Sequence, residues 1–209
     1  MSKIAIVGGG GLAKEIIEVI EMIGDEVYGI FAIKNSLDYP YFGYLDELNQ
    51  HKNNFDGVIL AVGAVNKQGV ENRKNIIDFI YKNNIPLASV ISPLSTISKN
   101  VKIGKGVYIG HNVLISVDSK INNNVSINHN AIIGHDVIIE ENVSISPQVF
   151  IGGGVKIEND VMIGVASTIR QGVKIGKNSI IGMGSLVIKN IKPNVIVLAV
   201  ASKIYKGQI

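Results

Sequence analysis

The sequence predicts a small α/β domain followed by a parallel β-helix, and three observations support this fold class. In residues 1–90, short apolar runs that resemble buried strands alternate with stretches of helical periodicity. From Ile97 to Val187, an isoleucine or valine recurs at every sixth position through sixteen consecutive hexads. Glycine or asparagine follows many of these isoleucines, where corners between short strands are expected. Two domains are therefore expected, residues 1–90 and 91–209.

The first domain is expected to be a Rossmann-like half-domain with a parallel sheet, because strand and helix alternate with short connections. A four-glycine loop follows the first strand and precedes the first helix. The predicted strands cover 3–7, 27–31 and 57–62, and the predicted helices cover 12–20, 44–50 and 71–82.

The hexads of the second domain predict a β-helix, because neither an α-helix nor an alternating strand has a period of six. Four residues after each recurring isoleucine stands a small or β-branched residue, in a series that runs from Val101 to Ile191. Three hexads make one coil of 18 residues, so the isoleucines stack inward as ladders over a little more than five coils. Handedness does not follow from this pattern.

The amino-acid composition excludes several classes of function. The chain has 46% hydrophobic and 18% charged residues, which is typical of a globular protein. No stretch approaches the roughly 20 apolar residues of a membrane span, and the apolar run after Lys3 is too short for a signal peptide. The net charge of +3 includes no basic block, so nucleic acid is not an expected partner. The absence of cysteine is compatible with a cytoplasmic location, which is what we expect.

Along its whole length the sequence resembles the sialic-acid and amino-sugar acetyltransferase family. This family includes nucleotide-linked 4-amino-sugar N-acetyltransferases of bacterial glycan pathways and O-acetyltransferases of sialic acid pathways. The resemblance implies a left-handed β-helix, a homotrimer and acetyl-CoA as the donor. It is carried by residues 8–15, 90–93, 127–136, 145–147 and 182–187.

His135 is the candidate general base. Acetyl transfer to an amine or hydroxyl needs a base that works near neutral pH, which an imidazole provides. Asp136 follows it directly, and the pair resembles the family's catalytic histidine and acidic residue. One coil further on stands Gly153, whose N–H is expected to stabilise the oxyanion, as a glycine amide does in the family. The expected mechanism is direct attack on acetyl-CoA without a covalent enzyme intermediate.

The other three histidines are assigned no catalytic role. His51 lies in a polar stretch and is expected to be exposed. His111 and His129 are one coil apart and are expected to stack, as a structural ladder, an acceptor-site feature or a trimer contact, of which we favour the first. Stacked histidines also suggest the zinc site of γ-class carbonic anhydrases. There, two ligands have four residues between them, whereas five separate His129 from His135, so no metal is expected.

The glycine loop predicts a phosphate site, because a loop between a strand and a helix offers its N–H groups to anions. An acidic residue should close the second strand of a dinucleotide fold, but Lys34 ends that segment, so NAD is not expected. The resemblance also disfavours a UDP-linked substrate, because UDP-sugar members of the family carry acidic residues at this place and a histidine where this sequence has Leu12; dTDP, GDP or no nucleotide remain open. The expected substrate-binding residues, the last three of them from the resemblance, are Gly8, Gly10, Gly11, Lys34, Gly63, Arg73 and Asn128.

In the family, CoA lies in the groove between neighbouring β-helices. The resemblance implies that the donor contacts small residues of the upper coils and one lysine near the end of the chain. These residues are Gly153, Gly164, Ala166, Gly182, Gly184 and Lys203, the last being all that remains of the family's Gly-x-Pro-Ala-Lys motif.

Together these patterns predict an acetyl-CoA-dependent N-acetyltransferase. Its expected acceptor is a nucleotide-linked amino sugar, and its expected role is in bacterial surface glycan synthesis. The alternative within the same chemistry is O-acetylation of a sugar or sialic acid, because the same base can deprotonate a hydroxyl. The alternative of another class is a non-catalytic sugar-nucleotide-binding subunit. The sequence names neither the sugar nor its nucleotide.

Overall fold

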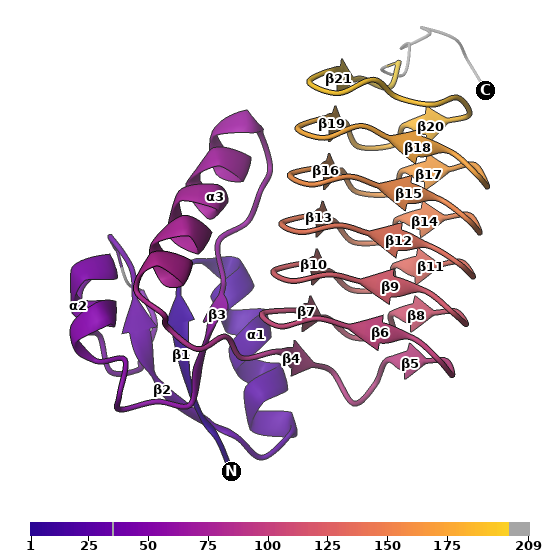
Figure 1. Ribbon diagram of the computed structural model, residues 1–209. Helices are drawn as coiled ribbons and strands as arrows, with labels where there is room; N and C mark the ends of the chain where they lie inside the picture. Colours follow the sequence, from indigo (N-terminus) through magenta and orange to yellow (C-terminus); the bar gives the residue numbers. More distant parts are fainter. Residues whose placement is uncertain (35, 201–209) are drawn as a thin grey trace, which may run out of the picture.

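The computed structural model describes residues 1–34 and 36–200, which form an α/β domain beside a tall triangular prism (Figure 1). The α/β domain has a parallel three-stranded sheet of order β2-β1-β3. Its elements are β1 (Lys3–Val7), α1 (Gly11–Met22), β2 (Glu26–Phe31), α2 (Leu45–Gln50), β3 (Gly57–Leu60) and α3 (Lys67–Lys82).

The sheet is covered on both faces, which is why its strands consist of continuous apolar runs. Ile4 and Ile6 of β1 face α1, whose buried residues include Ile16 and Ile20. The alternate β1 residues face α2 and α3 on the other side. The predicted α/β alternation is therefore confirmed.

The third helix begins four residues before the predicted start. The Asn66 side chain accepts a hydrogen bond from the Gly69 N–H at 2.9 Å and caps α3. The first turn, from Lys67 to Val70, carries little apolar periodicity, so the hydrophobic pattern alone placed the start at Glu71.

His51 is half-buried, so the prediction of an exposed loop residue is wrong. It ends α2, and its Nδ1 lies 2.6 Å from the Tyr28 hydroxyl. Its ring packs against Phe42 with the ring centres 4.5 Å apart. An aromatic cluster in the first domain therefore holds this histidine despite its polar neighbours in the sequence.

The prism is built from two-residue strands in three parallel sheets, which we call faces 1, 2 and 3 in chain order. Face 1 contains β4 (Val90–Ile91), β7 (Tyr108–Ile109), β10 (Ser126–Ile127), β13 (Ser144–Ile145), β16 (Met162–Ile163), β19 (Ile180–Ile181) and β21 (Ile196–Val197). Face 2 contains β5 (Thr96–Ile97), β8 (Leu114–Ile115), β11 (Ile132–Ile133), β14 (Phe150–Ile151), β17 (Thr168–Ile169) and β20 (Leu186–Val187). Face 3 contains β6 (Lys102–Ile103), β9 (Lys120–Ile121), β12 (Ile138–Ile139), β15 (Lys156–Ile157) and β18 (Lys174–Ile175).

The second residue of nearly every strand points into the prism, as the hexad ladder predicted. Each pairs with its equivalent one coil on, as Ile127 pairs with Ile145, and these residues form one buried core with the valines at the corners. The ladder starts one strand earlier than predicted, at Val90–Ile91. It gives about six coils rather than a little over five.

The corners use a different position from the one expected for unusual backbone angles. The residue three places after the ladder isoleucine has a positive φ, in a series spaced by six from Asn100 (62°) to Gly184 (66°). Gly134, directly after its ladder isoleucine, is needed for another reason. A Cβ on Gly134 would lie 2.6 Å from the Gly153 nitrogen, so its missing side chain lets successive coils stack closely.

The last coil is two residues shorter than the others, which corrects the predicted end of the repeat. Ile191 pairs with Ile175 and Val197 pairs with Ile181, so these pairs are separated by 16 residues. Ile191 was expected as the last of the residues four places after a ladder isoleucine, but it takes the ladder position instead. The Asn190 side chain accepts a hydrogen bond from the Lys174 N–H at 2.9 Å and closes the shorter corner.

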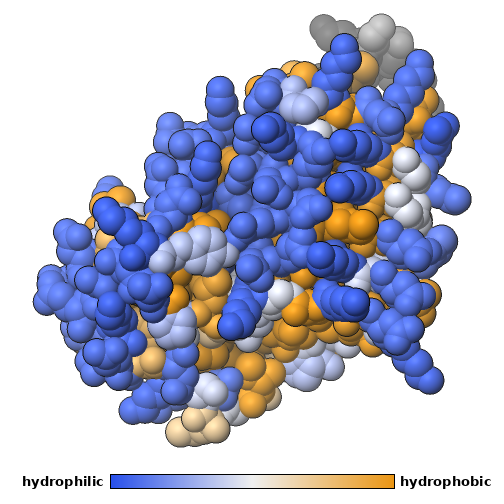
Figure 2. Space-filling model, in the orientation of Figure 1, coloured by the Kyte–Doolittle hydropathy of each residue, from blue (hydrophilic) through white to orange (hydrophobic). Residues whose placement is uncertain are grey.

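Hydrophilic side chains cover α3 and much of the coils on the side of the molecule shown in Figure 2. Within residues 1–34 and 36–200, no helix has the length and apolarity needed to cross a bilayer.

Candidate active site

His135 and Asp136 form a pair at the corner where face 2 turns into face 3. The imidazole Nδ1 lies 2.7 Å from the Asp136 carboxylate. Asp136 is the corner residue with positive φ (56°). Both side chains are more than half exposed. A carboxylate beside Nδ1 favours the proton on that nitrogen, so Nε2 is left as the proton acceptor.

Gly153 lies directly against this imidazole, one coil above. A Cβ on Gly153 would lie 2.7 Å from His135 Cε1 and 2.9 Å from Cδ2. The neighbouring Gly152 and Gly154 N–H groups bond to carbonyls of adjacent coils. For the Gly153 N–H, no acceptor is found in the described part of the chain. The structure thus brings together the three residues predicted to be catalytic, with an unpaired N–H donor beside the base.

A groove of about 530 Å³ runs between the α/β domain and the prism. Its walls are the glycine loop at the start of α1 and residues 61–65 after β3. The sheet order reverses between β1 and β3, and ligands of open α/β sheets bind beyond the strand ends at such a point. Its floor is formed by face 1 and the corner where face 1 turns into face 2: Ser126, Asn128, Ser144, Ile145, Ser146, Pro147 and Val165.

Four of the predicted substrate-binding residues line this groove, namely Gly10, Gly11, Gly63 and Asn128. Gly8 does not line it. Its φ of +125° and its N–H bond to the Phe31 carbonyl instead shape the end of β1. Lys34, which is exposed beyond β2, is not among the lining residues either.

Arg73 also lies away from the groove wall, because it is buried between α3 and the prism with 1% exposure. Its guanidinium donates to the Asn142 Oδ1 at 3.1 Å, the Val62 carbonyl at 2.9 Å and the Asn124 carbonyl at 2.7 Å. Burial lowers the pKa of Arg73 to about 10. These contacts make Arg73 a link between the two domains, whereas the sequence suggested a cleft residue.

The predicted donor-binding residues lie on two different corners. Gly164, Ala166, Gly182 and Gly184 line the corner between faces 1 and 2 in the upper coils, whereas Gly153 lies on the corner between faces 2 and 3. Lys203 lies outside the described residues. Within one chain these groups do not form a single site.

His111 and His129 stack as predicted, with ring centres 5.0 Å apart. They face α1, where His111 Nε2 lies 3.5 Å from Glu18 and His129 Nε2 lies 3.4 Å from Glu15. Among the described residues, no group of three His, Cys, Asp or Glu side chains is arranged to hold a metal ion.

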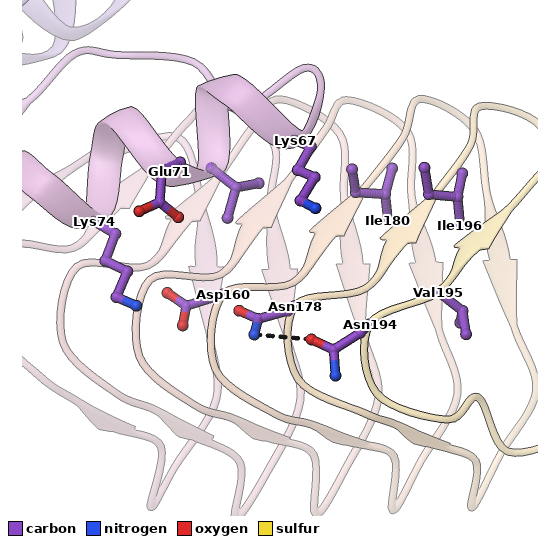
Figure 3. A pocket seen from close by; sticks show the side chains of 10 residues that line it. Lys67, Glu71, Lys74, Asp160, Asn178, Ile180, Asn194, Val195 and Ile196 are labelled. Carbon is purple, nitrogen blue, oxygen red and sulfur yellow. Dashed lines mark hydrogen bonds between the residues drawn. The ribbon is translucent and has the colours of Figure 1, made fainter.

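A second, smaller cavity of about 290 Å³ lies between α3 and the upper coils (Figure 3). Lys67, Glu71 and Lys74 of α3 face Asp160 and a hydrogen-bonded pair of corner asparagines there. It contains residues of both charges, and none of the predicted site residues within 1–34 and 36–200 lies in it.

The structural comparisons agree with the predicted class. Residues 3–78 match the PglD N-terminal domain, and residues 118–153 and 154–189 match the bacterial transferase hexapeptide repeat. A histidine-to-asparagine mutant of perosamine N-acetyltransferase from Caulobacter crescentus, solved with CoA and GDP-perosamine, is 26% identical. It superimposes with a TM-score of 0.84 over 99% of this chain and 98% of that chain. PerB from the same organism, with the same ligands, is 27% identical over 94% of this chain and 93% of its own, with a TM-score of 0.83.

The fold is also similar to the acetyltransferase domain of PglB from Neisseria gonorrhoeae, with 22% identity, a TM-score of 0.81 and coverage of 94% of this chain and 96% of that one. The curated proteins give no significant match.

Fold and site together define a hexapeptide-repeat acetyltransferase, built on a left-handed parallel β-helix. Within that class, the chain is similar along its whole length to sugar N-acetyltransferases solved with CoA, and its N-terminal region matches the PglD N-terminal domain.

The polar floor of the groove was not predicted from the sequence. Ser126 and Ser144 occupy the outward position of face 1 in successive coils, where Tyr108 precedes them and Met162 follows. Two serines one coil apart were a signal that the 18-residue spacing could have revealed. Glu15 was noted only as part of the glycine-loop motif.

Proposed function

We propose that the protein transfers an acetyl group from acetyl-CoA to the amino group of a nucleotide-linked amino sugar, for bacterial surface glycan synthesis. The observation that carries the proposal is the His135–Asp136 pair placed against Gly153, whose N–H is unpaired. Because acetyl-CoA is the donor, the proposed location of the reaction is the cytoplasm.

The acceptor amine attacks the thioester carbonyl of acetyl-CoA, and His135 Nε2 removes the proton that the amine loses. The Gly153 N–H donates to the oxyanion of the tetrahedral intermediate. As the intermediate collapses, the carbon–sulfur bond breaks and the imidazolium returns the proton to the CoA sulfur. Asp136 keeps the ring oriented and stabilises its positive charge.

A GDP-linked sugar is the first acceptor to test, because the two Caulobacter structures contain GDP-perosamine. The groove beside the glycine loop supports a phosphate-bearing ligand, because α1 begins there with Gly11. O-acetylation would use the same base and oxyanion donor, so only the product distinguishes the two reactions.

We further propose a homotrimer, because face 2 carries an exposed apolar stripe. Its outward residues Leu114, Ile132, Phe150 and Leu186 are 41%, 43%, 45% and 70% exposed. The groove lies on one side of face 2 and His135 lies on the other. A head-to-tail ring brings these opposite edges together. The groove of one subunit would then lie beside His135 of the next subunit. CoA would contact the corner between faces 1 and 2 of one subunit and the corner between faces 2 and 3 of the other.

The test is release of CoA thiol from acetyl-CoA with GDP-, dTDP- and UDP-linked 4-amino sugars, followed by NMR of the product. Thiol release with one acceptor and an amide-linked acetyl group in the product are expected. An ester-linked product would replace N-acetylation with O-acetylation. No release with any amine or hydroxyl acceptor would favour a non-catalytic binding subunit.

A further inference from the structure

One residue gives the groove a charge. The other lining residues are glycine, alanine, valine, leucine, isoleucine, proline, serine or asparagine, so Glu15 is the only ionisable one within the described part of the chain. Its side chain is 41% exposed and projects from α1, one turn beyond the glycine loop. A single carboxylate in a neutral groove selects a ligand group that donates hydrogen bonds.

The imidazole of His129 lies against this carboxylate, and one of its tautomers is fixed by a hydrogen bond. Its Nδ1 accepts a hydrogen bond from the His111 backbone N–H at 2.8 Å, so Nδ1 carries no proton. The ring proton is therefore on Nε2, which lies 3.4 Å from the Glu15 Oε2. The second carboxylate oxygen of Glu15 remains available to the groove.

His129 also sets the orientation of Asn128. The His129 backbone N–H donates to the Asn128 Oδ1 at 2.7 Å. This bond uses the acceptor atom of the asparagine side chain and leaves its NH2 group as the donor. Asn128 and Glu15 line the same groove, so His129 presents a donor and an acceptor together.

We infer that Glu15 and Asn128 form a hydroxyl-binding subsite for the acceptor, with His129 as its positioning residue. A hydroxyl both donates, to Glu15, and accepts, from the Asn128 amide. A phosphate only accepts and an ammonium only donates, so neither satisfies both residues.

The Ser144 hydroxyl supports the subsite. This side chain lines the groove, is 8% exposed, and its oxygen has no hydrogen-bond partner in the described residues. Buried polar atoms are almost always paired, so an unpaired hydroxyl here indicates a missing polar partner. The inference rests on the proposed function, and the recognised hydroxyl belongs either to the ribose or to the sugar ring.

The experiment measures, by calorimetry, the Kd of GDP-perosamine for the full-length protein, or of its dTDP- or UDP-linked counterpart if that is the acceptor used. Glu15→Gln and His129→Ala are each expected to weaken binding by about 10-fold, because the first removes the carboxylate that accepts from the hydroxyl and the second removes the imidazole that lies against this carboxylate. The double variant should be no weaker than either single one, because both changes remove the same interaction. The Kd of CoA should not change.

Glu18→Gln is the matched control. It lies on the same face of α1 and faces His111 in the same way, but it does not line the groove. Its acceptor Kd should stay within about 2-fold of wild type. His129→Gln, which can still donate to Glu15, should recover much of the affinity that His129→Ala loses.

Acceptors lacking one hydroxyl identify its source. We compare the Kd of the 2′-deoxyribose form of the acceptor with the Kd of its 3-deoxy sugar form. For the form that lacks the recognised hydroxyl, Glu15→Gln should not weaken the Kd any further. Wild-type affinity in Glu15→Gln, with acetyl transfer intact, overturns the subsite and leaves the proposed function standing. A wild-type protein that neither binds nor acetylates any of the three nucleotide-linked sugars overturns both.

Discussion

At the scale of single residues, the contact between His135 and Gly153 has a direct consequence for activity. Gly153→Ala places a Cβ on the imidazole and must displace it, because two ring carbons would lie within 2.9 Å. We expect kcat to fall by about 100-fold, the cost typical of a displaced catalytic group. Steady-state kinetics with thiol detection measures this.

The control for this substitution is Gly172→Asn. Gly172 has a positive φ (70°), and no atom lies within 4 Å of a Cβ added there, while asparagine fills equivalent corners elsewhere. Its kcat should match wild type. A fully active Gly153→Ala would mean that the ring does not need its observed position.

Ala166 is strained, because it has a φ of 55° at a corner position that asparagine, aspartate or glycine usually fills. An alanine with left-handed backbone angles costs about 1 kcal/mol. Ala166→Gly is therefore expected to raise the free energy of unfolding by about that amount, measured by urea denaturation. An unchanged or lower stability would show that the corner is not strained.

How far the sequence predicted individual residues depended on the regularity of the repeat. The 18-residue period placed Gly153 next to His135 and His111 next to His129, because stacked coils turn sequence distance into contact. Arg73 and His51 could not be placed in this way. Their surroundings depend on how α2 and α3 pack, which no local pattern encodes.

At the scale of elements, Arg73 links α3 to the prism. Arg73→Ala leaves the Asn142 side chain and two carbonyls without their donor in a buried position. We expect a loss of about 3 kcal/mol in the free energy of unfolding, because three acceptors in a buried position lose their hydrogen-bond donor. Thermal and urea unfolding measure it.

Lys74→Ala is the comparison for this prediction, because Lys74 is the next residue on α3 and is exposed. It should change stability by less than about 0.5 kcal/mol. Equal effects of the two substitutions would show that Arg73 does not link the domains.

Element boundaries were predicted less well than element types. The start of α3 depends on a side-chain cap at Asn66, and the shortened last coil depends on Asn190, so both are set by single hydrogen bonds. The hydrophobic period cannot detect either of them. The hydrophobic period did predict the ladder positions of the uninterrupted coils, because each hexad buries one isoleucine or valine in the same way.

At the scale of the whole molecule, the apolar stripe of face 2 predicts self-association. Phe150→Glu, at a residue 45% exposed in the middle of the stripe, is expected to convert trimers to monomers, because it buries an unpaired charge in the interface. Lys156→Glu on face 3 should leave the trimer intact. Light scattering coupled to gel filtration measures the mass, and a monomeric wild type would contradict the prediction.

The separation of the groove from His135 is the part of the site that the sequence could not predict. Each set of residues is local to one corner, and only the three-dimensional prism shows that face 2 lies between them. Whether they meet depends on a partner subunit, which neither the repeat nor the glycine loop specifies.

The most direct test of the central claim, that this chain is an acetyltransferase with His135 as its base, is the effect of His135→Ala on acetyl transfer. CoA-thiol release is measured with a saturating amino-sugar acceptor, and melting temperature confirms that the variant is folded. The account predicts a drop in kcat of at least about 100-fold, because general base catalysis typically contributes that much. A folded His135→Ala protein that transfers acetyl at the wild-type rate would contradict it.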